Sequence, residues 1–312
     1  MTTKSTTALA FSFSKLLLAA TLLSFGIGSA HAVVLSDNQA KMAANAIAAS
    51  SGNVYNVAVT VAQNVTANTG ASDAAANAAK IVKYLPSKLQ ALVAGRVGVG
   101  VALNYPNQLP VITAGLVSSN PKNVTFLVYQ LAQAGGFDQA SQIALGLNLV
   151  MRNSEVLLKQ SWGISNAIMM AISNRAGISL TDRANQLGYV AANLTLGLTN
   201  SSKNCYSATT AIKTVATALS FWLQNLTANA ENRESLIYNV VGNFALTVKN
   251  SGASPSTILL ILSQAQTVFQ QQFPGSASVT QAIQAVLGGS TGGIDNTGGV
   301  NHPETPFVDA QR

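Results

Sequence analysis

The chain has 312 residues, of which 48% are hydrophobic and only 9% are charged, with a formal net charge of +7. An average globular domain carries about 25% charged residues, so apolar side chains are plentiful here and ions are scarce. This composition excludes an intrinsically disordered protein, which combines low hydrophobicity with high charge. The single cysteine excludes a disulfide-rich scaffold, and 24 glycines with 8 prolines exclude a collagen-like repeat.

The first part of the chain, residues 1–32, has the three parts of a secretory signal peptide. Two lysines precede an apolar stretch over residues 16–27, and Ala30 and Ala32 form the small-x-small pattern that signal peptidases cleave. The apolar stretch is shorter than the roughly 20 residues of a membrane-spanning helix, and polar residues interrupt every later apolar run. We therefore expect cleavage after Ala32, no transmembrane span in the mature chain, and export to the periplasm, the cell surface or the extracellular space.

The region from residue 33 to residue 288 has the pattern of successive amphipathic helices. Its apolar residues recur at three- and four-residue spacing, without the alternation typical of strands. Capping residues or an N-terminal proline mark the clearest helix starts, which are Asn120-Pro121, Ser179, Asn229 and Ser254-Pro255. The helix after Asn229 is expected to hold Glu231 in its first turn, where a negative charge favours the helix dipole. We predict a single elongated all-α domain over residues 33–288 and a flexible tail, containing glycine and proline, over residues 289–312.

Four segments share the phrase Pro-x-x-apolar-x-x-apolar, and they begin at Pro86, Pro106, Pro121 and Pro255. The first three follow one another closely, so that two successive helices have about the length of one helix pair in a repeat protein. This spacing favours an α-solenoid-like stack of helix pairs. Any amphipathic helix that begins with proline produces the same phrase, so a non-repetitive all-α fold remains the alternative.

Residues with catalytic or metal-binding chemistry are few. The two histidines, His31 and His302, fall in the predicted signal peptide and tail, which excludes Ser-His-Asp, Cys-His and zinc sites within the predicted domain. The glycine-rich segment 95–100 lacks the strand and the lysine of a phosphate-binding loop, so we expect its glycines to permit close helix packing. Cys205 is either a small buried side chain or the donor of an intermolecular disulfide. We therefore predict no enzyme activity, no metal site and no cofactor.

The polar faces of the predicted helices carry Asn, Gln, Ser and Thr where most proteins have Glu and Lys. Burying amides and hydroxyls costs less than burying ions if their hydrogen bonds are remade, and a surface with few charges lacks the usual barrier to association. Trp162 and Trp222 lie in apolar helical surroundings, so we expect both in the core. These features favour an exported structural or interaction protein that contacts copies of itself or another envelope protein.

A second interpretation rests on a basic stretch. Between Asp73 and Asp138 the chain has no acidic residue, and the cations there are Lys80, Lys83, Lys88, Arg96 and Lys122. An exported basic surface attracts anionic lipid or an anionic envelope polysaccharide, although such a run can also serve only to keep an apolar region soluble. Nucleic acid is not expected as a partner, because basic and aromatic residues do not cluster.

Overall fold

The computed structural model describes residues 34–50, 52–134, 139–151, 154–199 and 208–289. Within these ranges the chain forms α-helices and short 3₁₀ turns without any strand, which confirms the predicted all-α fold class. The predicted signal peptide with Ala30 and Ala32, Cys205 and nearly all of the predicted tail lie outside the described residues. None of the described helices combines the length and the apolarity needed to cross a membrane.

The described helices divide into two compact units, with the boundary between Gln108 and Leu109. The helices of unit 1 are α2 (Asp37–Ala48), α3 (Val54–Thr66), α4 (Ala74–Tyr84) and α5 (Ser87–Asn104). Those of unit 2 are α6 (Leu109–Ser119), α7 (Val124–Ala134), α8 (Gln139–Met151), α9 (Glu155–Lys159), α10 (Ser161–Ser173), α11 (Leu180–Thr199), α12 (Ala208–Thr227), α13 (Arg233–Lys249), α14 (Pro255–Gln272) and α15 (Ala277–Leu287). The extent of a single domain over residues 33–288 stays a prediction.

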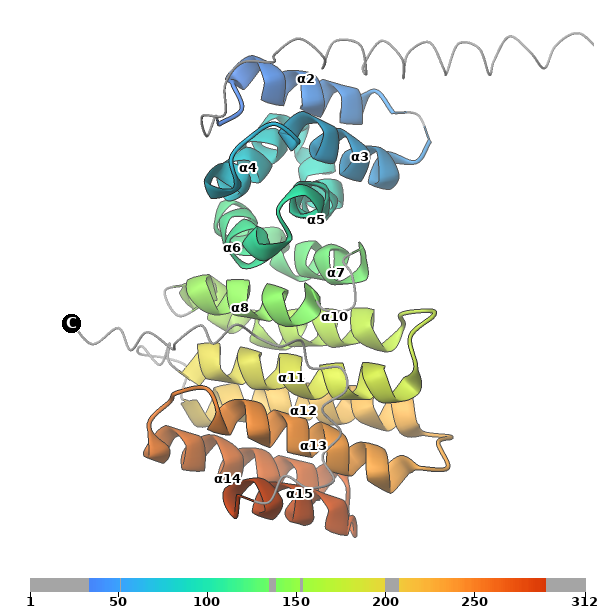
Figure 1. Cartoon of the computed structure of the whole chain (residues 1–312), viewed down its shortest axis with the longest axis vertical. Helices are drawn as coiled ribbons and strands as arrows, with labels where there is room; N and C mark the ends of the chain where they lie inside the picture. The colour runs from blue at the N-terminus through green and yellow to red at the C-terminus, as the bar shows by residue number, and fades with distance from the viewer. Residues whose placement is uncertain (1–33, 51, 135–138, 152–153, 200–207, 290–312) are drawn as a thin grey trace, which may run out of the picture. The chain divides into compact units, whose positions relative to one another are not determined.

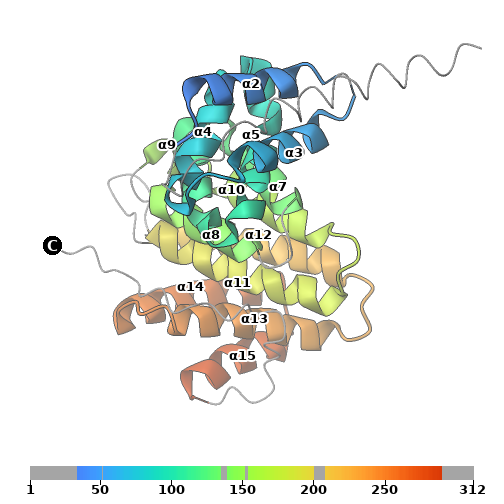
Figure 2. The same ribbon diagram turned by 45° about the horizontal axis from the view of Figure 1, so that its top comes forward.

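In unit 1, α5 packs against α3 and α4, while α2 packs against α3 and α4 (Figures 1 and 2). The α3–α5 contact is unusually close at Gly100, where an added Cβ would collide with the carbonyl oxygen of Val59 and lie 2.8 Å from Cβ of Ala62. Only glycine lets the two backbones approach so closely. The expectation that the glycines of segment 95–100 serve helix packing is therefore confirmed at Gly100.

In unit 2, leaving aside the short α9, each helix packs against the helix two places further along the chain. One series runs α6, α8, α11, α13 and α15, and the other runs α7, α10, α12 and α14; within each series neighbours are in contact. The two series meet chiefly where α11 contacts α10 and α12. Figure 1 shows α8, α11, α13 and α15 following one another down the view. Two packed layers of helices result.

The centre of unit 2 is α11, which contacts α8, α10, α12 and α13. Every residue from Ala184 to Thr199 is buried, although the segment includes Asn185, Gln186 and Asn193. A helix that is buried on all sides must be surrounded by other helices. At Gly188 an added Cβ would lie 2.5 Å from the carbonyl oxygen of Val240, so α11 and α13 are again in close backbone contact.

Of the four predicted helix starts, those at Ser254 and Ser179 are confirmed by capping hydrogen bonds. At Asn120-Pro121 a 3₁₀ turn precedes α7, and the start predicted at Asn229 is wrong. Ser254 accepts a hydrogen bond from the backbone N–H of Thr257 at 3.2 Å, and Ser179 accepts one from Asp182 at 3.0 Å. Glu231 lies outside the first turn of its helix, because a turn precedes α13 and the helix begins at Arg233.

Alanine at Gly100 is expected to lower the free energy of unfolding. Overpacking in a tight core costs about 1–3 kcal/mol, against a gain of roughly 1 kcal/mol from helix propensity, so we expect a net loss. Gly52→Ala is the matched control, because an added Cβ at Gly52 meets nothing within 4 Å. Denaturant unfolding measures both variants, and equal stability of the two would contradict the close α3–α5 contact.

Candidate functional site

One helix series of unit 2 is almost free of charge. In α7, α10, α12 and α14, Lys213 is the only charged residue. Three aromatic side chains of this series are also exposed, namely Phe126 at 40%, Trp162 at 46% and Phe221 at 48%. The expectation that Trp162 lies in the core is therefore wrong, and Trp222 is only partly buried.

Phe126 and Trp162 lie in the first turns of two neighbouring helices, α7 and α10. A Cβ added at Gly163 would lie 3.0 Å from Oγ1 of Thr125, so the residues next to Phe126 and Trp162 are in close proximity. Nε2 of Gln160 donates to the carbonyl oxygen of Pro121 at 3.0 Å, which joins the beginnings of α10 and of the 3₁₀ turn Pro121–Asn123 that leads into α7. The two helices therefore run in the same direction with their starts aligned.

The next helix, α12, is joined to α10 by a hydrogen bond. Nε1 of Trp222 donates to Oδ1 of Asn166 at 2.6 Å, and Asn166 lies one helical turn after Trp162. Phe221 meets Trp222 edge to face, with ring centroids 5.4 Å apart. Aromatic rings of three adjacent helices are thereby brought to one side of unit 2.

A second ring on α7 completes this set. Tyr129 stacks with Phe126 at a centroid distance of 6.5 Å, and Nε2 of Gln133 donates to the Tyr129 hydroxyl at 3.2 Å. We use the term aromatic face for five residues: Phe126, Tyr129, Trp162, Phe221 and Trp222.

On each of the three helices an amide follows an aromatic residue by one turn. The pairs are Tyr129 and Gln133 on α7, Trp162 and Asn166 on α10, and Phe221 and Asn225 on α12. Residues four positions apart lie on the same side of a helix, so a row of amides accompanies the row of rings. This four-residue spacing is visible in the sequence, but only the packing shows that the three pairs lie on adjacent helices.

The aromatic face offers stacking surfaces and hydrogen bonds, but no acid–base chemistry of the usual kind. Its three helices contain no carboxylate, imidazole or thiol. Elsewhere in the described part of the chain, no group of three or more His, Cys, Asp or Glu residues is placed to hold a metal ion. The geometry therefore suits recognition of a ligand, and the absence of enzyme activity and of cofactors stays a prediction.

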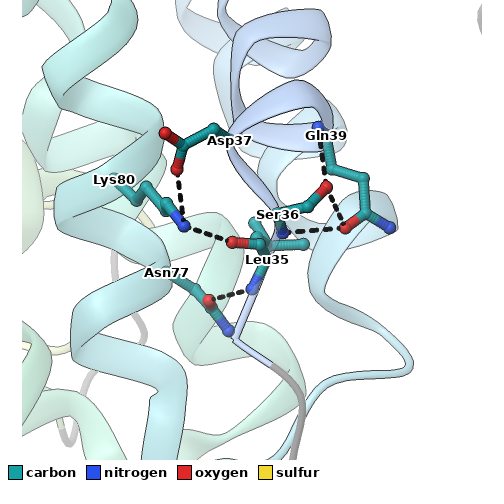
Figure 3. Close-up of polar contacts among 6 residues, drawn as sticks. All are labelled: Leu35, Ser36, Asp37, Gln39, Asn77 and Lys80. Carbon is teal, nitrogen blue, oxygen red and sulfur yellow. Dashed lines mark hydrogen bonds and ion pairs between the residues drawn. The ribbon is translucent and has the colours of Figure 1, made fainter.

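The basic stretch is not one uniform surface. Nζ of Lys80 lies 2.8 Å from Oδ1 of Asp37 and donates to the carbonyl oxygen of Leu35 at 2.6 Å (Figure 3). The backbone N–H of Leu35 donates to Oδ1 of Asn77 at 2.8 Å. Lys80 and Asn77 on α4 thus fix the chain just before α2, so Lys80 has a structural role.

The other four cations differ in exposure and location. The guanidinium of Arg96 is half-buried and lies 5.6 Å from the ring centroid of Tyr55, a cation–π distance. Lys83 and Lys88 are exposed in unit 1, whereas Lys122 is exposed in unit 2. Within unit 1, therefore, Lys83 and Lys88 are the members of the stretch best placed to meet a partner.

The contact of Lys80 with Asp37 has an electrostatic consequence. Hydrogen bonds from Lys80 and then from Tyr84 stabilise the carboxylate and lower the pKa of Asp37 below its usual 3.8. The same carboxylate raises the pKa of Tyr84, because it stabilises the protonated hydroxyl.

Lys80→Gln is expected to raise the pKa of Asp37 towards 3.8. A carboxyl group whose pKa is lower in the folded state than in the unfolded state stabilises the fold at pH values above its unfolded-state pKa. This contribution is lost as the pH falls through the folded-state pKa. The variant should therefore show a weaker loss of stability on acidification. Titration of the carboxyl carbon by NMR checks the pKa, and unfolding at neutral and acidic pH checks the stability.

Lys159→Gln is the control for that variant. It removes an exposed i,i+4 pair with Glu155, and such pairs contribute about 0.3–0.5 kcal/mol. It should leave the pKa of Asp37 unchanged. An unaltered Asp37 pKa in Lys80→Gln would contradict the assigned contact.

No known protein family, no curated protein and no solved structure matches this chain. Its function is therefore inferred from its own residues, and the aromatic face is the feature with the most distinctive chemistry.

Proposed function

We propose that this protein is an exported, non-enzymatic interaction protein that binds an envelope partner through its aromatic face. The observation that supports it most directly is the exposure of Phe126, Trp162 and Phe221 on adjacent helices. Contiguous exposed apolar patches mark binding sites in soluble proteins, and Trp and Tyr are the residues that most often dominate binding energy. Five rings gathered on a layer with one charged residue fit such a site.

The arrangement of unit 2 supports the same function. Two series of helices, each packed on its neighbour, are typical of stacked helix pairs, and such stacks present extended surfaces for binding. We propose that unit 2 is a short α-solenoid-like stack and that α7, α10 and α12 supply its binding surface. The partner is either a component of the envelope or a second copy of the chain.

Combined replacement of Trp162 and Phe221 by alanine is expected to abolish most of this binding. Alanine replacement of a dominant interface residue costs about 2 kcal/mol or more, which weakens binding about 30-fold. Both side chains are half exposed, so the fold should be retained. Co-sedimentation of the mature protein with envelope fractions, and sedimentation velocity for self-association, measure the effect.

Leu149→Ala is the matched control, because Leu149 is 47% exposed on α8, outside the aromatic face. It should bind as the wild type does. If the double variant also binds and self-associates as the wild type does, the proposed function is wrong.

A second candidate function is attachment to an anionic surface through unit 1. Lys41 and Lys83 flank the ring of Tyr84, with Nζ atoms 5.2 and 5.7 Å from its centroid, and Lys88 is exposed at the start of α5. Cations near an anionic membrane contribute about 1 kcal/mol each. Of the basic stretch, Lys83 and Lys88 would then contact the anionic surface, whereas Lys80 stabilises the fold.

Replacement of Lys83 and Lys88 by glutamine is expected to weaken co-sedimentation with phosphatidylglycerol vesicles about 30-fold at low salt. Replacement of Lys122 and Lys213 removes the same charge from unit 2 and is the matched control. Equal effects of the two pairs would show that net charge, and not this cluster, drives binding. Absence of vesicle binding by the wild type would exclude the candidate.

A further inference from the structure

We propose that the aromatic face binds a neutral, hydroxyl-rich glycan chain, with sugar rings stacked on Trp162 and its neighbours and sugar hydroxyls bonded to the adjacent amides. This inference rests on the proposed function and names the chemical class of the partner. A pyranose ring presents C–H groups on its faces and hydroxyls at its edge. It therefore needs flat apolar surfaces next to uncharged hydrogen-bonding groups, and the aromatic face supplies both.

The rings of the aromatic face other than Trp162 are restrained by neighbouring side chains before any ligand binds. The Asn166 amide holds Trp222, Phe221 packs on Trp222 edge to face, and Gln133 bonds the Tyr129 hydroxyl. A preorganised surface loses less conformational entropy on binding. A purely apolar contact surface would have less need of such hydrogen-bonded rings.

The neighbouring amides retain hydrogen-bonding capacity of both kinds. Asn166 accepts from Trp222 through Oδ1, which leaves its NH₂ group to donate. Asn225 donates through Nδ2 to the carbonyl oxygen of Phe221 at 2.9 Å, which leaves Oδ1 to accept. Sugar hydroxyls both donate and accept, so they can use either group.

The charge of this layer favours a neutral ligand over an ionic one. Lys213 is the only charged residue of α7, α10, α12 and α14. Lys122 lies in the turn before α7, and Lys159, which precedes α10, is paired with Glu155. A polyanion would therefore meet cations at the starts of these helices but few along the row of rings. A hydrocarbon surface would bury the amide row without hydrogen bonds, which is costly.

The spacing of the helices suits a chain molecule. Axes of packed neighbouring helices lie about 8–10 Å apart, which is about the length of two pyranose rings in an extended chain. Rings on α7, α10 and α12 could therefore meet every second sugar of a chain that crosses the three helices. Affinity is then expected to increase with oligosaccharide length until all three helices are covered.

Tryptophan fluorescence of the mature protein, titrated with oligosaccharides, tests the inference. The probes are neutral oligomers of glucose, mannose and N-acetylglucosamine, from two to eight sugars, with oligogalacturonate as the anionic comparison. We expect at least one neutral series to give saturable binding that strengthens with length and is equal at low and high salt. Trp162→Ala should weaken it about tenfold, which is the order of effect that truncation of a central binding residue has, whereas Trp162→Phe should restore part of the affinity.

Leu149→Ala should bind glycan as the wild type does, and circular dichroism verifies the fold of each variant. If no neutral series binds while the double replacement of Trp162 and Phe221 still impairs envelope binding or self-association, the glycan inference is overturned and the proposed function stands. Salt-sensitive binding of oligogalacturonate alone would also overturn the inference. Failure of both assays would reject the two proposals together.

Discussion

Close contact between helix backbones is the interaction on which this structure depends. With only 9% charged residues, the chain has few ion pairs available to join its helices, so packing of small and apolar side chains must hold them. Glycine permits the closest contacts, at Gly100 between α3 and α5 and at Gly188 between α11 and α13. At Gly146 in α8 an added Cβ would lie 2.8 Å from Cβ of Thr113 in α6. The same device therefore recurs in both units.

Several of the scarce cations are used at the ends of neighbouring helices. Arg183 donates to the carbonyl oxygen of Ser173 at 2.6 Å, and Lys249 donates to that of Val286 at 2.5 Å. Arg175 bonds the carbonyl oxygen of Ala132 at the end of α7 in the same way. A cation at a helix C-terminus satisfies unpaired carbonyls and favours the helix dipole. The sides of the helices are left to amides, hydroxyls and aromatic rings, and the aromatic face is part of that neutral surface.

Local sequence signals predicted where helices begin better than they predicted which side chains are exposed and what those side chains contact. Ser254 and Pro255 predicted the start of α14, because capping is decided by adjacent residues. The exposure of Trp162 could not be predicted, since α10 is apolar on most of its circumference and only its neighbours decide which side faces water. Lys80 and Lys83 look alike in the sequence, yet Lys80 bonds Asp37 and Leu35 from a distant segment while Lys83 is exposed. Long-range packing, which no local pattern encodes, separates these roles.

Tightly packed, weakly charged helices surround α11 in unit 2. Hydrogen–deuterium exchange of the mature protein tests this packing directly, because the slowest amides report the most stable part of a fold. Amides from Ala184 to Thr199 should be the slowest to exchange in unit 2, and those of α15 should exchange sooner. Exchange over Ala184–Thr199 as fast as in α15 would contradict this packing, because α11 would then not be the core of unit 2.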